Sequence, residues 1–144
     1  MDAMSAEQLR AFWDKLVEAR NYKLEHRARH GIEASEYRYE LKIEIKMLDE
    51  VIAELRKILN PDRVPLNEHE TISLMGEGLL PVQVAKFGLF LAMAMENRKD
   101  RLAKENLNSG DSCRRNQFYI DLENEQHVIR WVDRELDMVF RQAQ

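Results

Sequence analysis

The 144 residues of the chain are the usual length of one domain; 44% are hydrophobic, enough for a core, and 33% are charged, which gives a highly charged surface. A net charge of −4 argues against a general nucleic-acid binder, because such proteins are usually basic. The single cysteine, Cys113, excludes an intrachain disulfide and favours a reducing, cytoplasmic location.

A first helix is predicted over residues 6–30. Ser5 and Gln8 have the spacing of a capping box, in which each side chain binds the backbone N–H of the other residue. Gly31 suits the position just beyond the helix end. The apolar stripe at 3-4-3 spacing consists of Leu9, Phe12, Leu16 and Ala19. We therefore expect one face of this helix to be buried.

A second helix is predicted over residues 36–59, with Ser35 as its N-cap and Asn60-Pro61 as its stop. Its apolar residues alternate at spacings of four and three, which is the heptad pattern of a coiled-coil seam. These residues are Leu41, Ile45, Leu48, Ile52, Leu55 and Leu59. We expect an antiparallel, coiled-coil-like hairpin over residues 6–59, long enough to project beyond the rest of the bundle.

The segment 62–78 is predicted to be an irregular connector that contains a short helix over residues 68–75. Asn67 has the character of an N-cap for that helix, and Glu70 completes a capping box. We therefore expect part of this connector, between the hairpin and the following helices, to be helical.

Two further helices are predicted over residues 81–142, at about 81–106 and 115–141. Pro81 is a favourable first residue, and the first half of the 81–106 helix is apolar almost all round, which predicts a buried helix. The whole chain is thus predicted to be all-α: a helical bundle of four long helices plus one short helix, in a single domain over residues 1–144.

The most suggestive stretch for function is RNYKLEHRARHG, which begins at Arg20. Its candidate binding residues are Arg20, Lys23, Arg27, Arg29 and His30. Such a basic patch suits phosphate groups of nucleic acid or an acidic protein surface. The favoured interpretation is that these cations pair across the hairpin with carboxylates at the start of the next helix. Those carboxylates are Glu33, Glu36, Glu40 and Glu44.

Arg20 and Asn21, followed by His26, form a pattern that resembles the catalytic signature of HEPN-type ribonucleases, which are all-α domains of about this size. The resemblance covers only these residues. It implies that the imidazole transfers a proton while the guanidinium stabilises the anionic transition state. As an alternative function it implies RNA cleavage, with two such sets facing each other in a dimer.

His26 and His30 lie one helical turn apart, a spacing that suits a zinc or nickel site. A third ligand would have to come through the fold from Glu33, His69, Cys113 or His127. The favoured expectation is therefore no metal and no cofactor. Cys113 precedes two arginines, which would activate a thiol, although an ordinary loop cysteine is favoured.

The sequence contains no phosphate-binding loop, nucleophile elbow or Ser/His/Asp arrangement. We therefore expect a non-enzymatic, helical protein-interaction protein: an adaptor, a small complex subunit, or an inhibitor that occludes a partner. Short, charge-dense helical chains of this kind are common on phages and mobile elements. The expected partner is another protein or protein complex.

A cluster of aromatic and methionine residues, Phe87, Phe90, Met93 and Met95, is expected to belong to the core, with a protein-binding face as the alternative. Part of the same apolar helix could form a homodimer seam, because it exceeds what one face of a small bundle buries. No membrane segment is expected, since the most apolar run, over residues 79–95, is short for a bilayer and is interrupted by Lys86.

Overall fold

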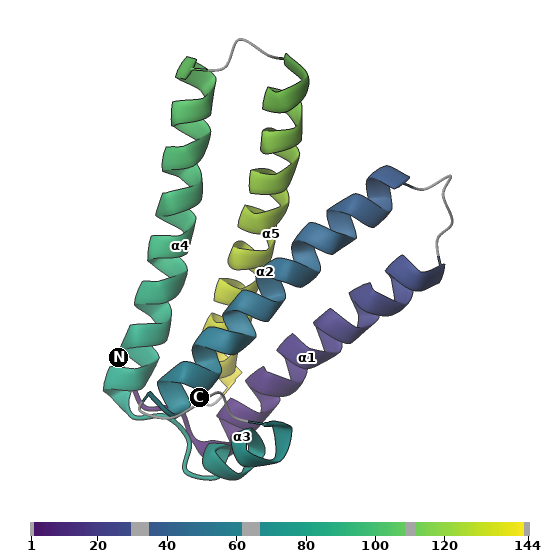
Figure 1. Ribbon diagram of the computed structural model, residues 1–144. Helices are drawn as coiled ribbons and strands as arrows, with labels where there is room; N and C mark the ends of the chain where they lie inside the picture. Colours follow the sequence, from purple (N-terminus) through teal and green to yellow (C-terminus); the bar gives the residue numbers. More distant parts are fainter. Residues whose placement is uncertain (1, 30–34, 62–66, 109–111, 143–144) are drawn as a thin grey trace.

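The computed structural model describes residues 2–29, 35–61, 67–108 and 112–142, and its helices confirm the predicted all-α bundle (Figure 1). Four of the helices are long and one is short. They are α1 (Ala6–Arg29), α2 (Ser35–Leu59), α3 (Glu68–Met75), α4 (Pro81–Asn108) and α5 (Ser112–Gln142). None of these described helices has the length and apolarity needed to cross a membrane.

The predicted capping box at α1 is complete, whereas at α3 the Asn67 cap forms but the Glu70 carboxylate accepts from Asn67 Nδ2 and not from the backbone N–H. The backbone N–H of Gln8 donates to Ser5 Oγ at 3.1 Å, and that of Ser5 donates to Gln8 Oε1 at 2.9 Å. At α3, the N–H of Glu70 donates to Asn67 Oδ1 at 2.8 Å. These bonds satisfy N–H groups that the first helical turn leaves without partners, which is why the helix starts were predictable. Gly31 lies outside the described residues.

The helices form two antiparallel hairpins, α1–α2 and α4–α5, which pack together at one end and diverge toward their tips (Figure 1). The predicted hairpin is therefore present, but it is not independent of the other, because α2 contacts α4 and α5 as well as α1. The short helix α3 packs against α1 and α2 at the closed end.

Helix α2 is buried on two sides. The predicted seam is buried at five of its six positions, and Leu59 is half-buried. A second row, at different positions of the helix, is buried as well: Ile43, Met47, Val51 and Ile58. This second row follows from the contacts of α2 with helices on more than one side. The main core cluster includes residues from all five helices.

The prediction that the apolar first half of the 81–106 helix is buried is wrong for one side of that helix. Helix α4 directs one row of side chains into the core, namely Val84, Phe87, Leu91 and Ala94. Of its other apolar residues, Phe90 and Met95 are half-buried against the core, whereas Val82, Leu89 and Met93 are 58%, 59% and 63% exposed. The reason is position: α4 lies at the edge of the bundle and packs against α2 and α5 on one side only (Figure 1).

The residues before α1 pair with the residues before α4. Met4 and Leu79 exchange two backbone hydrogen bonds, of 2.9 and 2.8 Å. Gly78 adopts a φ of +72°, and a Cβ atom there would lie 2.3 Å from the carbonyl oxygen of Met4. Only glycine fits this close approach, so the bridge fixes where α4 begins relative to α1.

Candidate functional site

Two cations of the Arg20–Arg29 stretch pair across the hairpin. Lys23 Nζ lies 2.6 Å from Glu44 Oε2, as expected from the glutamate series. Arg20 pairs instead with Asp49, one turn further along α2. These pairs join α1 to α2, and they neutralise two of the cations that would otherwise bind a nucleic-acid phosphate.

The remaining patch residues lie nearer the hairpin tip. Arg29 is exposed and lies 4.0 Å from Glu25 of its own helix. Arg27 is half-buried, and its Nε atom has no hydrogen-bond partner among the described residues. Glu36 is exposed and Glu40 is half-buried. His30 and Glu33 lie outside the described residues, so the patch as predicted is only partly visible.

The structure does not bring Arg20, Asn21 and His26 together within one chain. Six residues of α-helix rotate by about 600°, so Arg20 and His26 point roughly 120° apart and lie about 9 Å apart along the axis. Arg20 faces Asp49, whereas the His26 ring packs against Tyr22 with centroids 4.3 Å apart. A shared phosphate site would therefore need a second chain.

Within the described residues, no three His, Cys, Asp or Glu side chains come close enough to share a metal ion. Of the suggested third ligands, His69 and His127 are both exposed, on α3 and α5. His30, Glu33 and the side chain of Cys113 lie outside what the structure describes.

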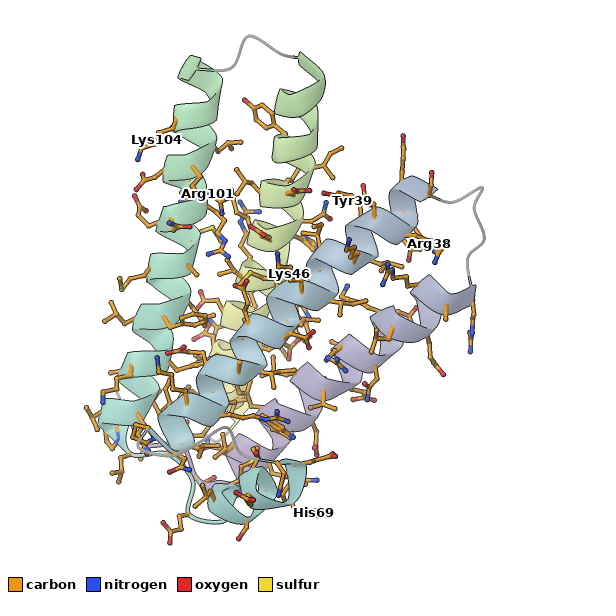
Figure 2. All side chains as sticks on the ribbon, viewed as in Figure 1. Arg38, Tyr39, Lys46, His69, Arg101 and Lys104 are labelled. Atoms are coloured by element: carbon orange, nitrogen blue, oxygen red, sulfur yellow. The ribbon has the colours of Figure 1, made fainter. Side chains whose placement is uncertain are left out.

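Among the described helices, the large aliphatic side chains with the highest exposure lie on the side of α4 that faces away from the bundle. We call this surface the α4 outer face; it consists of Val82, Ala85, Leu89, Ala92 and Met93, all exposed. Spacings of three and four residues put them on one helix face. Figure 2 shows that charged side chains, among them Arg101 and Lys104, take over along the second half of α4.

A groove of about 480 Å³ adjoins the α4 outer face, between α4 and the end of α2. We call it the α2–α4 groove. Its apolar lining consists of Ile58, Pro61, Leu89, Phe90, Met93 and Ala94. Two lysines, Lys57 and Lys86, and one carboxylate, Glu54, lie along it as well. Leu89 and Met93 belong to both the groove and the outer face, so the two form one continuous apolar surface.

Arg98 holds one end of this groove in place. Its side chain is 13% exposed, and it binds Glu50 of α2 at 3.2 Å and Glu125 of α5 at 3.1 Å. The same guanidinium lies 3.5 Å from the carbonyl oxygen of Ala94 and 3.6 Å from the sulfur of Met47. A largely buried arginine with partners on three helices fixes the spacing of α4 against α2, so the groove exists before any partner binds.

A second groove, of about 400 Å³, lies between α1 and α5 and includes Tyr22 and Trp131. Like the α2–α4 groove, it carries charges of both signs, with Lys15 and Glu18 one turn apart. It lacks a row of exposed aliphatic residues like that of α4, and we therefore regard the α4 surface as the better candidate.

The sequence identified part of the α4 surface as apolar but predicted that it lies in the core. Phe90 and Met93 belonged to the predicted aromatic and methionine cluster, for which a core position was favoured. Phe87 does lie in the core, where its ring meets that of Phe12 edge-on with centroids 5.7 Å apart. Met93 is exposed and Phe90 is half-buried. The available signal was the excess of apolar residues around the helix.

Comparison with known proteins gives no further guide to the site. No protein-family model, curated protein or solved structure matches the chain. Function is therefore argued from the geometry of the α4 surface.

Proposed function

We propose that this protein is a non-enzymatic interaction protein that binds a helix of a protein partner on the α4 outer face and in the α2–α4 groove. The observation that carries the proposal is the row of aliphatic side chains, Val82, Leu89 and Met93, each more than half exposed. Contiguous exposed apolar surface on a soluble domain is typical of interaction sites.

The shape and chemistry of the surface favour a helical ligand. A groove between two parallel ridges accepts the apolar face of an amphipathic helix, whose anchors recur every three or four residues. Met93 adds an adaptable, polarisable contact. Lys57 and Lys86 outnumber Glu54, the one unpaired carboxylate described along the groove, and so favour acidic residues beside those anchors. An adaptor, a complex subunit and an inhibitor would all use such a surface.

The test is a matched pair of variants. Leu89→Asp with Met93→Asp places two charges on the α4 surface, whereas Met138→Asp places one on α5, where Met138 is 44% exposed. Each protein is immobilised and exposed to nuclease-treated host lysate, and captured proteins are quantified by mass spectrometry. We expect a stoichiometric partner to be retained by wild type and Met138→Asp, and to fall at least about tenfold with the double variant.

Circular dichroism must first show that the double variant keeps its helical content. A partner that binds the double variant as well as wild type would contradict the proposal. Proteins captured from untreated lysate but not from nuclease-treated lysate would contradict the proposal too, since their binding would depend on nucleic acid.

A further inference from the structure

We propose that the tip of the α1–α2 hairpin binds a phosphate group, free or as a monoester, between the side chains of Arg27 and Arg38. This site is separate from the α4 surface and does not depend on the proposed function. It is marked by a difference between these two arginines and the other partly buried cations of the chain.

Six lysine and arginine side chains are partly buried in the part of the chain that the structure describes. Three of them have carboxylate partners, namely Arg20, Lys23 and Arg98. A fourth, Arg56, has its guanidinium carbon 5.4 Å from the centroid of the Trp13 ring. Arg27 and Arg38 form no ion pair or ring contact within the described residues, and the Nε atom of each is shielded from solvent without a hydrogen-bond partner.

The register of the hairpin places these two arginines at nearly the same level. Lys23 of α1 pairs with Glu44 of α2. Arg27 lies four residues beyond Lys23, and Arg38 lies six residues before Glu44, so they are nearer the tip by about 6 and 9 Å along the helix axes. Their levels therefore differ by only about 3 Å. Figure 2 shows Arg38 near that tip.

Both arginines occupy positions that face the junction of the two helices. In a pair of packed helices, residues seven apart share one face. Arg27 lies seven residues after Arg20, which faces Asp49 of α2. Arg38 lies seven residues before Ile45, a buried residue of the α2 seam. An arginine thus continues the seam where an apolar residue would stabilise the hairpin, and its neighbour across the junction is a second arginine.

Two neighbouring guanidinium groups without carboxylates are suited to an oxyanion. Each presents a planar fork of N–H donors that matches the oxygens of a phosphate or carboxylate. A phosphate monoester carries a charge of about −1.5 to −2 at neutral pH and has three free oxygens, so one group can neutralise and bind both arginines. A carboxylate or a phosphate diester carries only one negative charge and matches the pair less well.

Carboxylates near the tip limit the ligand to a single phosphate group. Glu36 is exposed, Glu40 is half-buried, and neither forms an ion pair within the described residues. Nucleic acid needs a row of cations along successive phosphates, and these carboxylates interrupt such a row. Glu40 lies one turn before Glu44, at the level of Arg27, and should weaken the binding of an anion there.

The test is titration of the full chain with inorganic phosphate, followed through the NMR signals of the arginine Nε–H groups, with chloride keeping the ionic strength constant. The signals of Arg27 and Arg38 are assigned from Arg27→Gln and Arg38→Gln. We expect both signals to shift along one saturable curve, whereas the signal of Arg10, at the far end of α1, should not shift.

Each of these two variants should raise the phosphate dissociation constant, reported by the remaining arginine, at least about fivefold, because half of the donors and half of the positive charge are lost. Glu40→Gln should lower that constant by about two- to threefold, because it removes a competing charge. Arg29→Gln is the matched control, since it makes the same charge change on an exposed residue of the same tip; it should stay within about twofold of wild type. Circular dichroism checks that each variant keeps its helical content.

Two further probes identify the source of the phosphate group. Dimethyl phosphate, a diester, should bind at least about threefold more weakly than inorganic phosphate. Glycerol 3-phosphate that binds more tightly than inorganic phosphate would identify an organic monoester as the ligand, and equal binding would identify free phosphate.

Four outcomes would overturn the proposal. They are shifts that do not saturate, dissociation constants unchanged in Arg27→Gln and Arg38→Gln, dimethyl phosphate that binds as tightly as inorganic phosphate, and an RNA oligomer without a terminal phosphate that shifts the same signals at lower concentration than inorganic phosphate. The last result would make the tip a nucleic-acid contact.

Discussion

Helices α2 and α4 have similar apolar content on more than one side but very different burial. α2 lies between α1 and the second hairpin, so both of its apolar rows enter the core. α4 lies at the edge, so one row is buried and the other faces solvent. The apolar pattern of a helix thus sets how much apolar surface it offers for burial, whereas its position in the bundle decides how much of that surface is covered.

The exposed apolar row of α4 also differs from the buried rows in its contribution to the stability of the fold. Apolar side chains stabilise a fold by leaving water, and Leu89 and Met93 remain largely in water. Burial of these two side chains therefore adds little to the stability of one chain. Association with another surface would supply the missing burial.

The largest effect is expected where the comparison is most direct. Leu48→Ala removes a fully buried side chain from α2, and should lower the free energy of unfolding by about 2–5 kcal/mol. Leu89→Ala on α4 makes the same chemical change on an exposed side chain, and should alter it by less than about 0.5 kcal/mol. Urea denaturation followed by circular dichroism measures both. Equal losses would mean that the α4 outer face is covered in solution.

The next effect concerns the position at which α4 begins. Gly78→Ala should lower the free energy of unfolding by more than about 2 kcal/mol, because alanine disfavours the positive φ and its Cβ would overlap the carbonyl of Met4. Gly76→Ala is the matched control. Gly76 has an ordinary φ of −59°, and its change should stay below about 1 kcal/mol in either direction. Similar losses at both glycines would count against the Met4–Leu79 bridge.

A smaller effect is expected at the contact that holds α4 beside α2. Arg98→Leu should cost about 1–3 kcal/mol, because Glu125, whose side chain is only 15% exposed, loses its charged partner. Arg10→Leu removes an exposed ion pair with Asp14 and should cost less than about 0.5 kcal/mol. The measurement is the midpoint and slope of urea denaturation. An Arg98→Leu variant as stable as wild type would show that packing alone positions α4.

The smallest effect concerns the pairing that sets α1 against α2. A double-mutant cycle on Lys23→Met and Glu44→Gln should give a coupling energy of about 0.5–1 kcal/mol, since both side chains are partly buried. The same cycle on Arg10 and Asp14, which are exposed, should give about 0.3 kcal/mol. A coupling no larger than this control would remove the ion pair as a determinant of hairpin register.

Most of the helix boundaries could be predicted because the signals that set them are local. Ser5 with Gln8 and Asn67 with Glu70 form their capping bonds within three residues. The buried face of α1 was predictable for a related reason, since Leu9, Phe12 and Leu16 of its one apolar stripe are buried.

The rest depended on contacts between distant segments. A single heptad seam predicts one partner for α2. The spacing of its apolar residues therefore did not predict that Met47 and Val51 would be covered by further helices. The all-round apolarity of α4 could equally have marked a central helix or an edge helix with a binding face. Choosing between them requires knowing which neighbours surround α4. Arg98 likewise gave no signal, because its two carboxylates lie far away in the sequence.

The divergence of the two hairpins has a consequence for how stability is distributed along each helix. Near the closed end, backbone amides lie beneath side chains from several helices, whereas toward the tips the two hairpins diverge, although Tyr39 near the start of α2 still donates to Asp121 of α5. Amide hydrogen exchange should therefore be graded within single helices. Amides around Leu16 and Leu55 should exchange only on global unfolding, and those around Leu24 through local opening at the tip of the α1–α2 hairpin.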